Sequence, residues 1–453
     1  MKMPTKTSSV VLLLILMLSK ISTQQLVSLK QLAEWKELEF EFPSPNIREN
    51  AILNNGYIPG NSVPIDVDID YRDHAASRVF VTIPRFTIGV PITLGTVTSK
   101  YGPNGPLIQA YPDYNWHSSH GRNCDGLTSV FRVAIDECRR LWILDSGRIG
   151  DNQLCAPQIV VFDLNTDLLI HRYKFPDNVY KPGVSLFITP VVDVRDPGPL
   201  GACANTMVYI ADVNGFGVIV YDYRRNVAWR TQNKYFYPNP DNGTFTIRGE
   251  SFDLMDGVLG MALSRKSPVP RAFGFHHTLA STPSIASDRY LFFHSLASIT
   301  ENRVALNVLD NQTAWNQNPD HSPRSFVKLG SRVSQSAAQA MDKNGNLFFG
   351  LMDPIGVACW DSSKPYTRNN MRLVTQNDEK LQFASGMKVV LNRKNKEELW
   401  VLTCSLQRVM TGSISSKVVN FRVQAIQIDE LLSGSECTRA GIEMGSSISF
   451  PVY

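Results

Sequence analysis

The chain has 453 residues, a formal net charge of +4, and 43% hydrophobic, 10% aromatic and 19% charged residues. This is a globular composition, and it excludes long disorder, collagen and a coiled coil. The 29 glycines and 26 prolines, together with a charged fraction below the usual value of about 25%, favour many short strands joined by turns. Only one long apolar run exists, so a multi-span membrane protein is excluded.

That apolar run covers residues 10–18, after Lys2 and Lys6 and before Ser19, Ser22 and Thr23. A basic start, a short apolar core and a small polar exit predict a secretory signal peptide over residues 1–23. Its removal would take away Lys2, Lys6 and Lys20 and no acid, which lowers the charge to +1. A near-neutral mature chain gives no electrostatic reason to expect nucleic acid or a membrane surface as a partner.

Secretion into an oxidising compartment makes the seven cysteines candidates for disulfide bonds rather than zinc ligands. No CxxC pair occurs, and no metal site is predicted. We expect the first four cysteines to pair among themselves and two of the last three to pair, which leaves one over; they are Cys124, Cys138, Cys155, Cys203, Cys359, Cys404 and Cys437. Asn242 and Asn311 begin glycosylation sequons that belong on exposed loops.

Six segments share one pattern, in which a short apolar strand and a polar turn lead to an apolar-aromatic pair that opens a second strand. The pairs are Val79-Phe80, Leu141-Trp142, Val208-Tyr209, Leu291-Phe292, Leu347-Phe348 and Leu399-Trp400. A weaker second hairpin follows, as in residues 159–170 and 218–229. Six repeats of four strands predict an all-β fold, a six-bladed β-propeller whose four-stranded blades surround a central channel.

We expect residues 24–453 to form this propeller as a single domain. Residues 24–60 would be an N-terminal segment that packs on the disc or closes the first blade, with a partly helical stretch over 26–42. Residues 424–432 return to apolar alternation and could complete the final blade, and residues 438–453 would be a C-terminal tail.

The innermost strands of a propeller line its channel, and the loops that lead into them converge on one face. Here those loops cover residues 123–126, 185–190, 251–257, 334–339 and 382–386. A mouth of carboxylates, amides and one aromatic ring would suit a small polar aromatic ligand, although Asp-Gly pairs also serve simply to cap turns. The candidate ligand-binding residues are Asp125, Asp253, Asp256, Gln335, Ser336, Gln339 and Phe383.

The histidines give weaker candidates for a metal or catalytic site. His276 and His277 are adjacent, so on a strand they would face opposite ways and could not serve one centre. His117 and His120 precede one of the channel loops and are better candidates for its rim. No GxSxG elbow, P-loop or HExxH motif is present.

Several stretches resemble the insect yellow and major royal jelly protein family. They include residues 141–147 (LWILDSG), 156–163 (APQIVVFD), 346–350 (NLFFG), 358–360 (ACW), 381–383 (LQF) and 54–59 (NNGYIP). The resemblance runs in order over roughly residues 26–437, and the chain is similar to yellow-type members because it lacks a long Asn/Met-rich tail. It implies a secreted six-bladed propeller, in agreement with the repeats, and a role in melanin pigmentation and cuticle hardening.

The resemblance also implies a small catechol or indole ligand, such as dopachrome, bound or isomerised in the channel. Isomerisation needs one positioned acid or base and no redox cofactor, and the candidate catalytic residues are Asp125 and Asp256, with a rim histidine, His117 or His120, as a further alternative. Two alternatives stay open: a non-catalytic binder of biogenic amines, and a structural cuticle or eggshell protein. Amine-binding relatives have an Asn shortly before the Cys-Trp pair, whereas residues 353–357 here contain none, although Asp353 could hold an ammonium.

Overall fold

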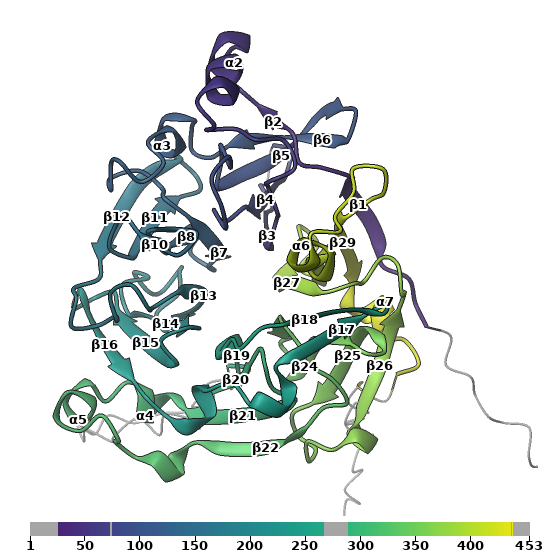
Figure 1. Cartoon of the computed structure of the whole chain (residues 1–453). Coiled ribbons are helices and arrows are strands. Elements are labelled where there is room, and N and C mark those ends of the chain that lie inside the picture. The colour runs from purple at the N-terminus through teal and green to yellow at the C-terminus, as the bar shows by residue number, and fades with distance from the viewer. Residues whose placement is uncertain (1–25, 73–74, 267–288, 436, 438–453) are drawn as a thin grey trace, which may run out of the picture.

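The structure is a computed structural model that describes residues 26–72, 75–266, 289–435 and 437. The predicted signal peptide, the predicted tail, His276 and His277 lie outside the described residues. Within them, six sheets stand around one axis, so the predicted six-bladed propeller is confirmed (Figure 1).

In each of the first three blades, four consecutive strands pair antiparallel, with the first strand innermost. A fifth strand from the N-terminal segment is added in parallel to the outer edge of the first blade, and in the second blade a short hairpin interrupts the sequence order. Their strands are β3 (Asp66–Asp70), β4 (Arg78–Thr82), β5 (Leu94–Gly102) and β6 (Gly105–Ala110); β7 (Val130–Ile135), β8 (Arg140–Asp145), β11 (Gln158–Asp163) and β12 (Leu168–Lys174); and β13 (Phe187–Val194), β14 (Thr206–Asp212), β15 (Gly217–Asp222) and β16 (Val227–Thr231).

The last three blades repeat this order, except that the sixth takes its outermost strand from the N-terminus. Their strands are β19 (Val258–Leu263), β20 (Tyr290–Ser295), β21 (Thr300–Ala305) and β22 (Val327–Ser331); β23 (Gln339–Met341), β24 (Asn346–Met352), β25 (Ile355–Asp361) and β26 (Met371–Gln376); and β27 (Ala384–Leu391), β28 (Glu397–Cys404), β29 (Phe421–Gln427) and β1 (Lys30–Trp35).

The ring closes in two places at once. β1 pairs with β29 in the sixth blade, and five residues later β2 (Phe40–Glu41) pairs in parallel with β6 in the first blade. The stretch expected to be partly helical is therefore a strand, and that expectation is wrong. Alternation explains this, because Ala33 and Trp35 are buried while Lys30 and Glu34 are exposed. Residues 421–427 form the third strand of the final blade; of the predicted segment 424–432, residues 424–427 lie in this strand and residues 428–431 form a helix.

Each apolar-aromatic pair lies on the second strand of its blade, where the sheet is covered on both faces by neighbouring blades. Strand β14, for example, is buried along its whole length, including Asp212. Each inner strand packs against the inner strand of the next blade, and the ring closes on itself. The order around the axis is β3, β7, β13, β19, β23 and β27, and β27 contacts β3. The repeat pattern thus marks the radial core.

Two short hairpins and a few helices lie outside the blades. The hairpins are β9 (Arg148–Ile149) with β10 (Asn152–Gln153), and β17 (Thr244–Ile247) with β18 (Glu250–Asp253). The helices are α2 (Pro45–Leu53), α3 (Asn115–Ser118), α4 (Leu306–Leu309), α5 (Gln312–Gln317), α6 (Leu406–Thr411) and α7 (Ile428–Leu431). Ser44 caps α2, because its hydroxyl accepts from the Ile47 N–H at 3.3 Å and Pro45 follows it.

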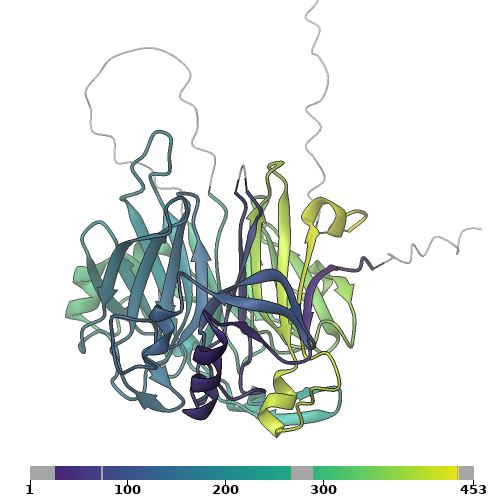
Figure 2. The ribbon, with the colours of Figure 1, turned by 90° about the horizontal axis from the view of Figure 1, so that it is seen from above.

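We call the face reached by the loops that lead into the inner strands the front face, and the opposite one the back face. Figure 2 shows α2 and α6 together on the front face. Three disulfides join Cys124 to Cys155, Cys138 to Cys203 and Cys359 to Cys437, and Cys404 is a buried free thiol. This confirms the predicted partition of the seven cysteines.

Candidate functional site

The front end of the axis is filled rather than hollow. The hairpin β17–β18 lies across it beside α6, and Phe245 and Phe252 stack with ring centroids 5.2 Å apart and planes at 12°. All six blades contribute an apolar side chain to the same buried cluster: Ile65, Phe131, Ile188, Leu259, Ala337 and Phe383. Four of the five loops expected to form an open mouth therefore build a plug, and residues 123–126 do not take part in it.

Several predicted ligand-binding residues hold this plug in place. The Gln335 amide donates to the carbonyls of Asn242 (3.1 Å) and Thr244 (2.9 Å), and Asp253 accepts from the Thr244 hydroxyl at 2.7 Å. Ser336 is buried, with its carbonyl oxygen 3.0 Å from Nε2 of His294. Phe383 is buried as well, in the left-handed backbone region at φ 48°.

The two candidate catalytic residues lie in contrasting surroundings. Asp125 is exposed at the outer side of the second blade, where its carboxylate is 2.9 Å from Lys174 of β12; that hydrogen bond and charge hold its pKa below the usual range. Asp256 is half-buried on the front face, and burial alone raises its pKa to about 6. Among the described residues its carboxylate has no hydrogen-bond or ion-pair partner.

The two histidines predicted for the rim also lie in different surroundings. His117 is fully buried between the Thr93 N–H (3.2 Å) and the Tyr111 carbonyl (2.9 Å), and burial lowers its pKa to about 3. His120 lines a groove of about 800 Å³ outside the ring, between α2 and the loops of the first two blades. Neither borders the axis.

Three further residues singled out from the sequence lie on the surface. Asn242 is half-buried at the front face, and Asn311 is exposed, with its side chain capping α5 by accepting from the Ala314 N–H at 3.2 Å. Asp353 is exposed, and its N–H donates to the Ser334 hydroxyl at 3.1 Å.

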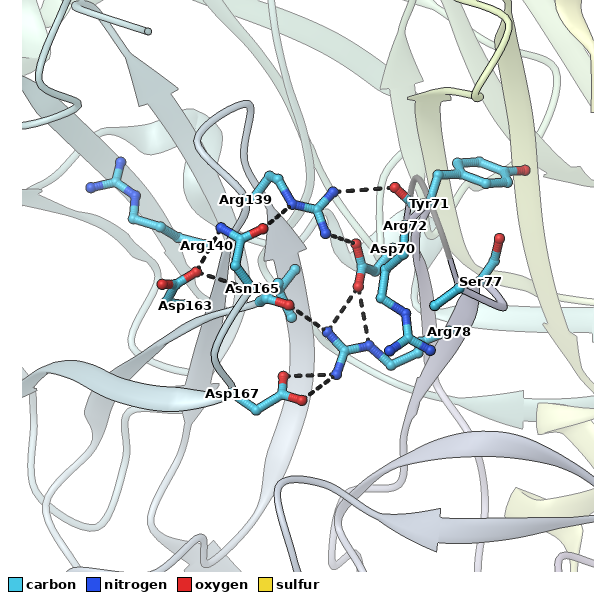
Figure 3. A network of polar contacts seen from close by, with 12 residues as sticks. Asp70, Tyr71, Arg72, Ser77, Arg78, Arg139, Arg140, Asp163, Asn165 and Asp167 are labelled. Atoms are coloured by element: carbon cyan, nitrogen blue, oxygen red, sulfur yellow. Dashed lines mark hydrogen bonds and ion pairs between the residues drawn. The ribbon is translucent and has the colours of Figure 1, made fainter. Parts of the chain in front are cut away.

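The back end of the axis is hollow. All six inner strands or their ends line a depression of about 620 Å³, which has a charged rim. Figure 3 shows how part of this rim is neutralised: Asp70 is 2.8 Å from Arg78 and 2.9 Å from Arg139, and Arg78 is 2.7 Å from Asp167. Because these charges compensate one another, the rim is a fixed part of the fold.

A deeper chamber of about 320 Å³ continues from this depression and shares several of its walls. Its polar lining includes Arg132, Thr189, Gln339 and Lys388, and Met261 and Met387 are among its apolar residues. Of the residues predicted from the sequence, Gln339 is the one that borders this space. Its amide nitrogen donates to the Phe292 carbonyl and to Glu301, both at 3.1 Å, while its oxygen is buried without a partner.

Two carboxylates on β3, which were not singled out from the sequence, accept hydrogen bonds from backbone N–H groups on the unpaired edge of β7. Asp66 accepts from the Val133 N–H at 3.2 Å and from Lys388 at 2.8 Å, and Asp68 accepts from the Ile135 N–H at 2.9 Å. Burial raises the pKa of Asp68 to about 7. The alternation DVDID was a visible signal, because buried acids on a strand need donors. Arg132 carried no signal beyond its place on an inner strand.

Within the ranges that the structure covers, no three His, Cys, Asp or Glu side chains gather so as to hold a metal ion. Nor does any helix among these residues combine the length and apolar character needed to cross a membrane.

The major royal jelly protein family model matches residues 128–286 and 276–437. Dopaminechrome tautomerase of Drosophila melanogaster is 32% identical over 431 residues, which cover 92% of this chain and 87% of that protein. Major royal jelly protein 9 of Apis mellifera is 33% identical, covering 89% of each chain. Protein yellow of Drosophila subobscura is 30% identical, covering 94% of this chain and 70% of the relative.

Proposed function

Because the chain belongs to the major royal jelly protein family, we propose that it is a secreted protein that tautomerises aminochromes, the cyclised quinones of catecholamines, during melanin formation in pigmented cuticle. The observation that carries this proposal is Asp256, a half-buried carboxylate with a raised pKa and no partner among the described residues. The similarity to a dopaminechrome tautomerase over 92% of the chain gives the substrate class.

The tautomerisation requires one general base and no oxidant or reductant. The base takes a proton from a ring carbon, the electron pair moves through the ring, and a quinone oxygen gains a proton, so substrate and product are isomers. A base works best when its pKa lies near the working pH. Asp256, with a pKa of about 6, meets this condition, whereas the Lys174 ion pair makes Asp125 a weaker base.

Aromatic surface lies beside Asp256. Phe216 and Tyr237 pack together with ring centroids 4.9 Å apart, and Tyr237 is half exposed. Phe216 packs directly on Gly257, where an added Cβ would lie 2.6 Å from its ring. A flat quinone can stack on such a surface, with its ring proton near the carboxylate of the neighbouring residue.

Secretion is supported by the oxidised state of six cysteines, since disulfides persist in extracellular compartments. The predicted signal peptide and the sequons at Asn242 and Asn311 agree with this. Intact-mass analysis of the protein recovered from a secreting insect cell culture would show both the cleavage and the glycans.

The decisive experiment follows the visible absorbance of freshly prepared dopaminechrome with the secreted protein. We expect faster loss of absorbance than in buffer, a drop of roughly 100-fold or more in kcat/KM for Asp256→Asn, and little change for Asp125→Asn. The rate should rise with pH through about 6 and then level off, because only the ionised carboxylate accepts a proton.

Absence of any acceleration would overturn the enzymatic proposal. Calorimetric titration with dopamine and serotonin would then distinguish the two alternatives. Heat of binding would indicate a non-catalytic amine binder, and the absence of heat would leave the structural cuticle role. Equal losses in Asp125→Asn and Asp256→Asn would mean that the base lies elsewhere.

A further inference from the structure

Arg132 on β7 is a buried guanidinium whose hydrogen-bonding capacity is only partly used. It is 4% exposed and lines the deep chamber on the back side of the axis. One terminal nitrogen donates to the Thr189 hydroxyl at 3.0 Å and the other to the Ser385 carbonyl at 2.6 Å. Since a guanidinium has five N–H donors, three are left without an acceptor among the described residues, and Nε is among them.

Asp66 attracts the Arg132 guanidinium and partly offsets the effect of burial on its pKa, but it does not hydrogen-bond it. Lys388, the other cation on the chamber wall, is bound to Asp66 at 2.8 Å. The acids on the chamber wall have other cations: Asp136 is 2.7 Å from Arg140, and Glu137 pairs with Lys266. No carboxylate of the described residues hydrogen-bonds Arg132. Burial lowers the pKa of this arginine, so its charge lacks the solvation it would have in water.

The remaining walls are apolar and soft. Met261, Met341 and Met387 line the chamber together with Ile135 and Val389. Methionine adapts to flat rings and makes favourable sulfur–aromatic contacts. A volume of about 320 Å³ lies within the range of small-molecule pockets.

We propose that the deep chamber is a second ligand site, which binds a planar aromatic monocarboxylate through the back face. The carboxylate accepts from the free N–H groups of Arg132, which match its fork geometry, and the ring lies among the methionines. The partnerless oxygen of Gln339 favours a ligand that also carries a hydroxyl or amine hydrogen. This site is separate from the one proposed at Asp256, because neither Asp256 nor Phe216 or Tyr237 lines the chamber, which continues from the depression on the back face.

The test compares 2-naphthoate with 2-naphthamide, a neutral analogue of nearly the same shape, by calorimetric titration of the full secreted protein. We expect naphthoate to bind at least about tenfold more tightly, the factor that a charge-assisted hydrogen bond supplies. Arg132→Gln should remove this preference. The matched control Arg225→Gln removes an exposed arginine, paired with Asp222 on the third blade, and should leave both affinities unchanged.

The comparison of the two ligands on the unaltered protein decides the proposal even if Arg132→Gln fails to fold. Equal affinities, or no heat with either ligand at millimolar concentration, would overturn it. The readout is binding, so it is also separate from the dopaminechrome assay: naphthoate binding with no tautomerase activity, or the reverse, would refute one proposal and leave the other standing.

Discussion

Arg85 and Arg132 are two buried arginines with opposite surroundings. Arg85, between the first and second blades near the front face, donates all five N–H groups to the backbone carbonyls of Val90, Leu127, Thr128, Pro91 and His117, at 2.5 to 3.3 Å. Arg132, on the channel wall, donates two. Neither is hydrogen-bonded to a carboxylate among the described residues.

The difference separates a structural charge from a charge that is available to a ligand. Burial lowers the pKa of Arg85 to about 10, yet every donor is satisfied, so nothing more can bind there. Four of its carbonyl partners lie in loops and the fifth, that of His117, lies in α3, and the arginine joins these segments. The chamber around Arg132 has the opposite properties, namely open space and unused donors.

The largest expected effect is on stability, and it compares the two arginines directly. Arg85→Met leaves five buried carbonyls without donors, at about 1–3 kcal/mol for each one that water cannot reach, so we expect the free energy of unfolding to fall by more than about 4 kcal/mol. Arg132→Met removes two bonds and relieves a desolvated charge, so the loss should stay below about 2 kcal/mol. Urea unfolding measures both. Similar losses would contradict the distinction drawn here.

Asp256 extends the comparison to an acid. Its pKa of about 6 in the folded protein exceeds the ordinary value of 3.8, so between these values the folded state binds more protons. The stability it contributes is therefore complete at low pH and is lost as the pH rises through about 6. Because the group is partly solvated, we expect Asp256→Asn to raise the unfolding free energy at pH 7 by only about 1 kcal/mol.

Thermal unfolding between pH 4 and pH 8 would measure this gain, with Asp125→Asn as the exposed control. A variant that is more stable and inactive would be typical of a functional group held at a cost in stability. Loss of stability in Asp256→Asn at pH 7 would show that the carboxylate has a partner in solution.

The smallest expected effect tests whether Cys404 compensates the charge of Arg132. The thiol is buried near Arg132, but burial raises its pKa to about 12 despite that attraction. We therefore expect no alkylation by iodoacetamide in the native protein at pH 8 and one modified cysteine after unfolding, measured by mass spectrometry. Rapid native alkylation would indicate a thiolate paired with Arg132, and the proposed anion site would already be filled.

The sequence by itself determined the radial framework. Alternating apolar residues, the six aromatic pairs and the turns between them recur locally, so the number of blades and the burial of the aromatic member of each pair follow from short stretches of chain. The cysteine partition was predictable too, because seven thiols in one oxidised chain leave one over. The role of residues 30–35 was missed, since a strand that pairs with residues 421–425 has its partner at the other end of the chain.

Only the tertiary structure decided which end of the axis is open. Four of the five loops that lead into the inner strands meet at the axis, but there they pack with the β17–β18 hairpin and fill the space. The Gln335 amide donates to Asn242 and Thr244 at the start of that hairpin, so it is not free for a ligand. The same holds for the charges: whether Asp125, Asp256 or Arg132 is compensated depends on residues from distant segments. Burial and pairing are set by three-dimensional neighbours, which no local pattern records.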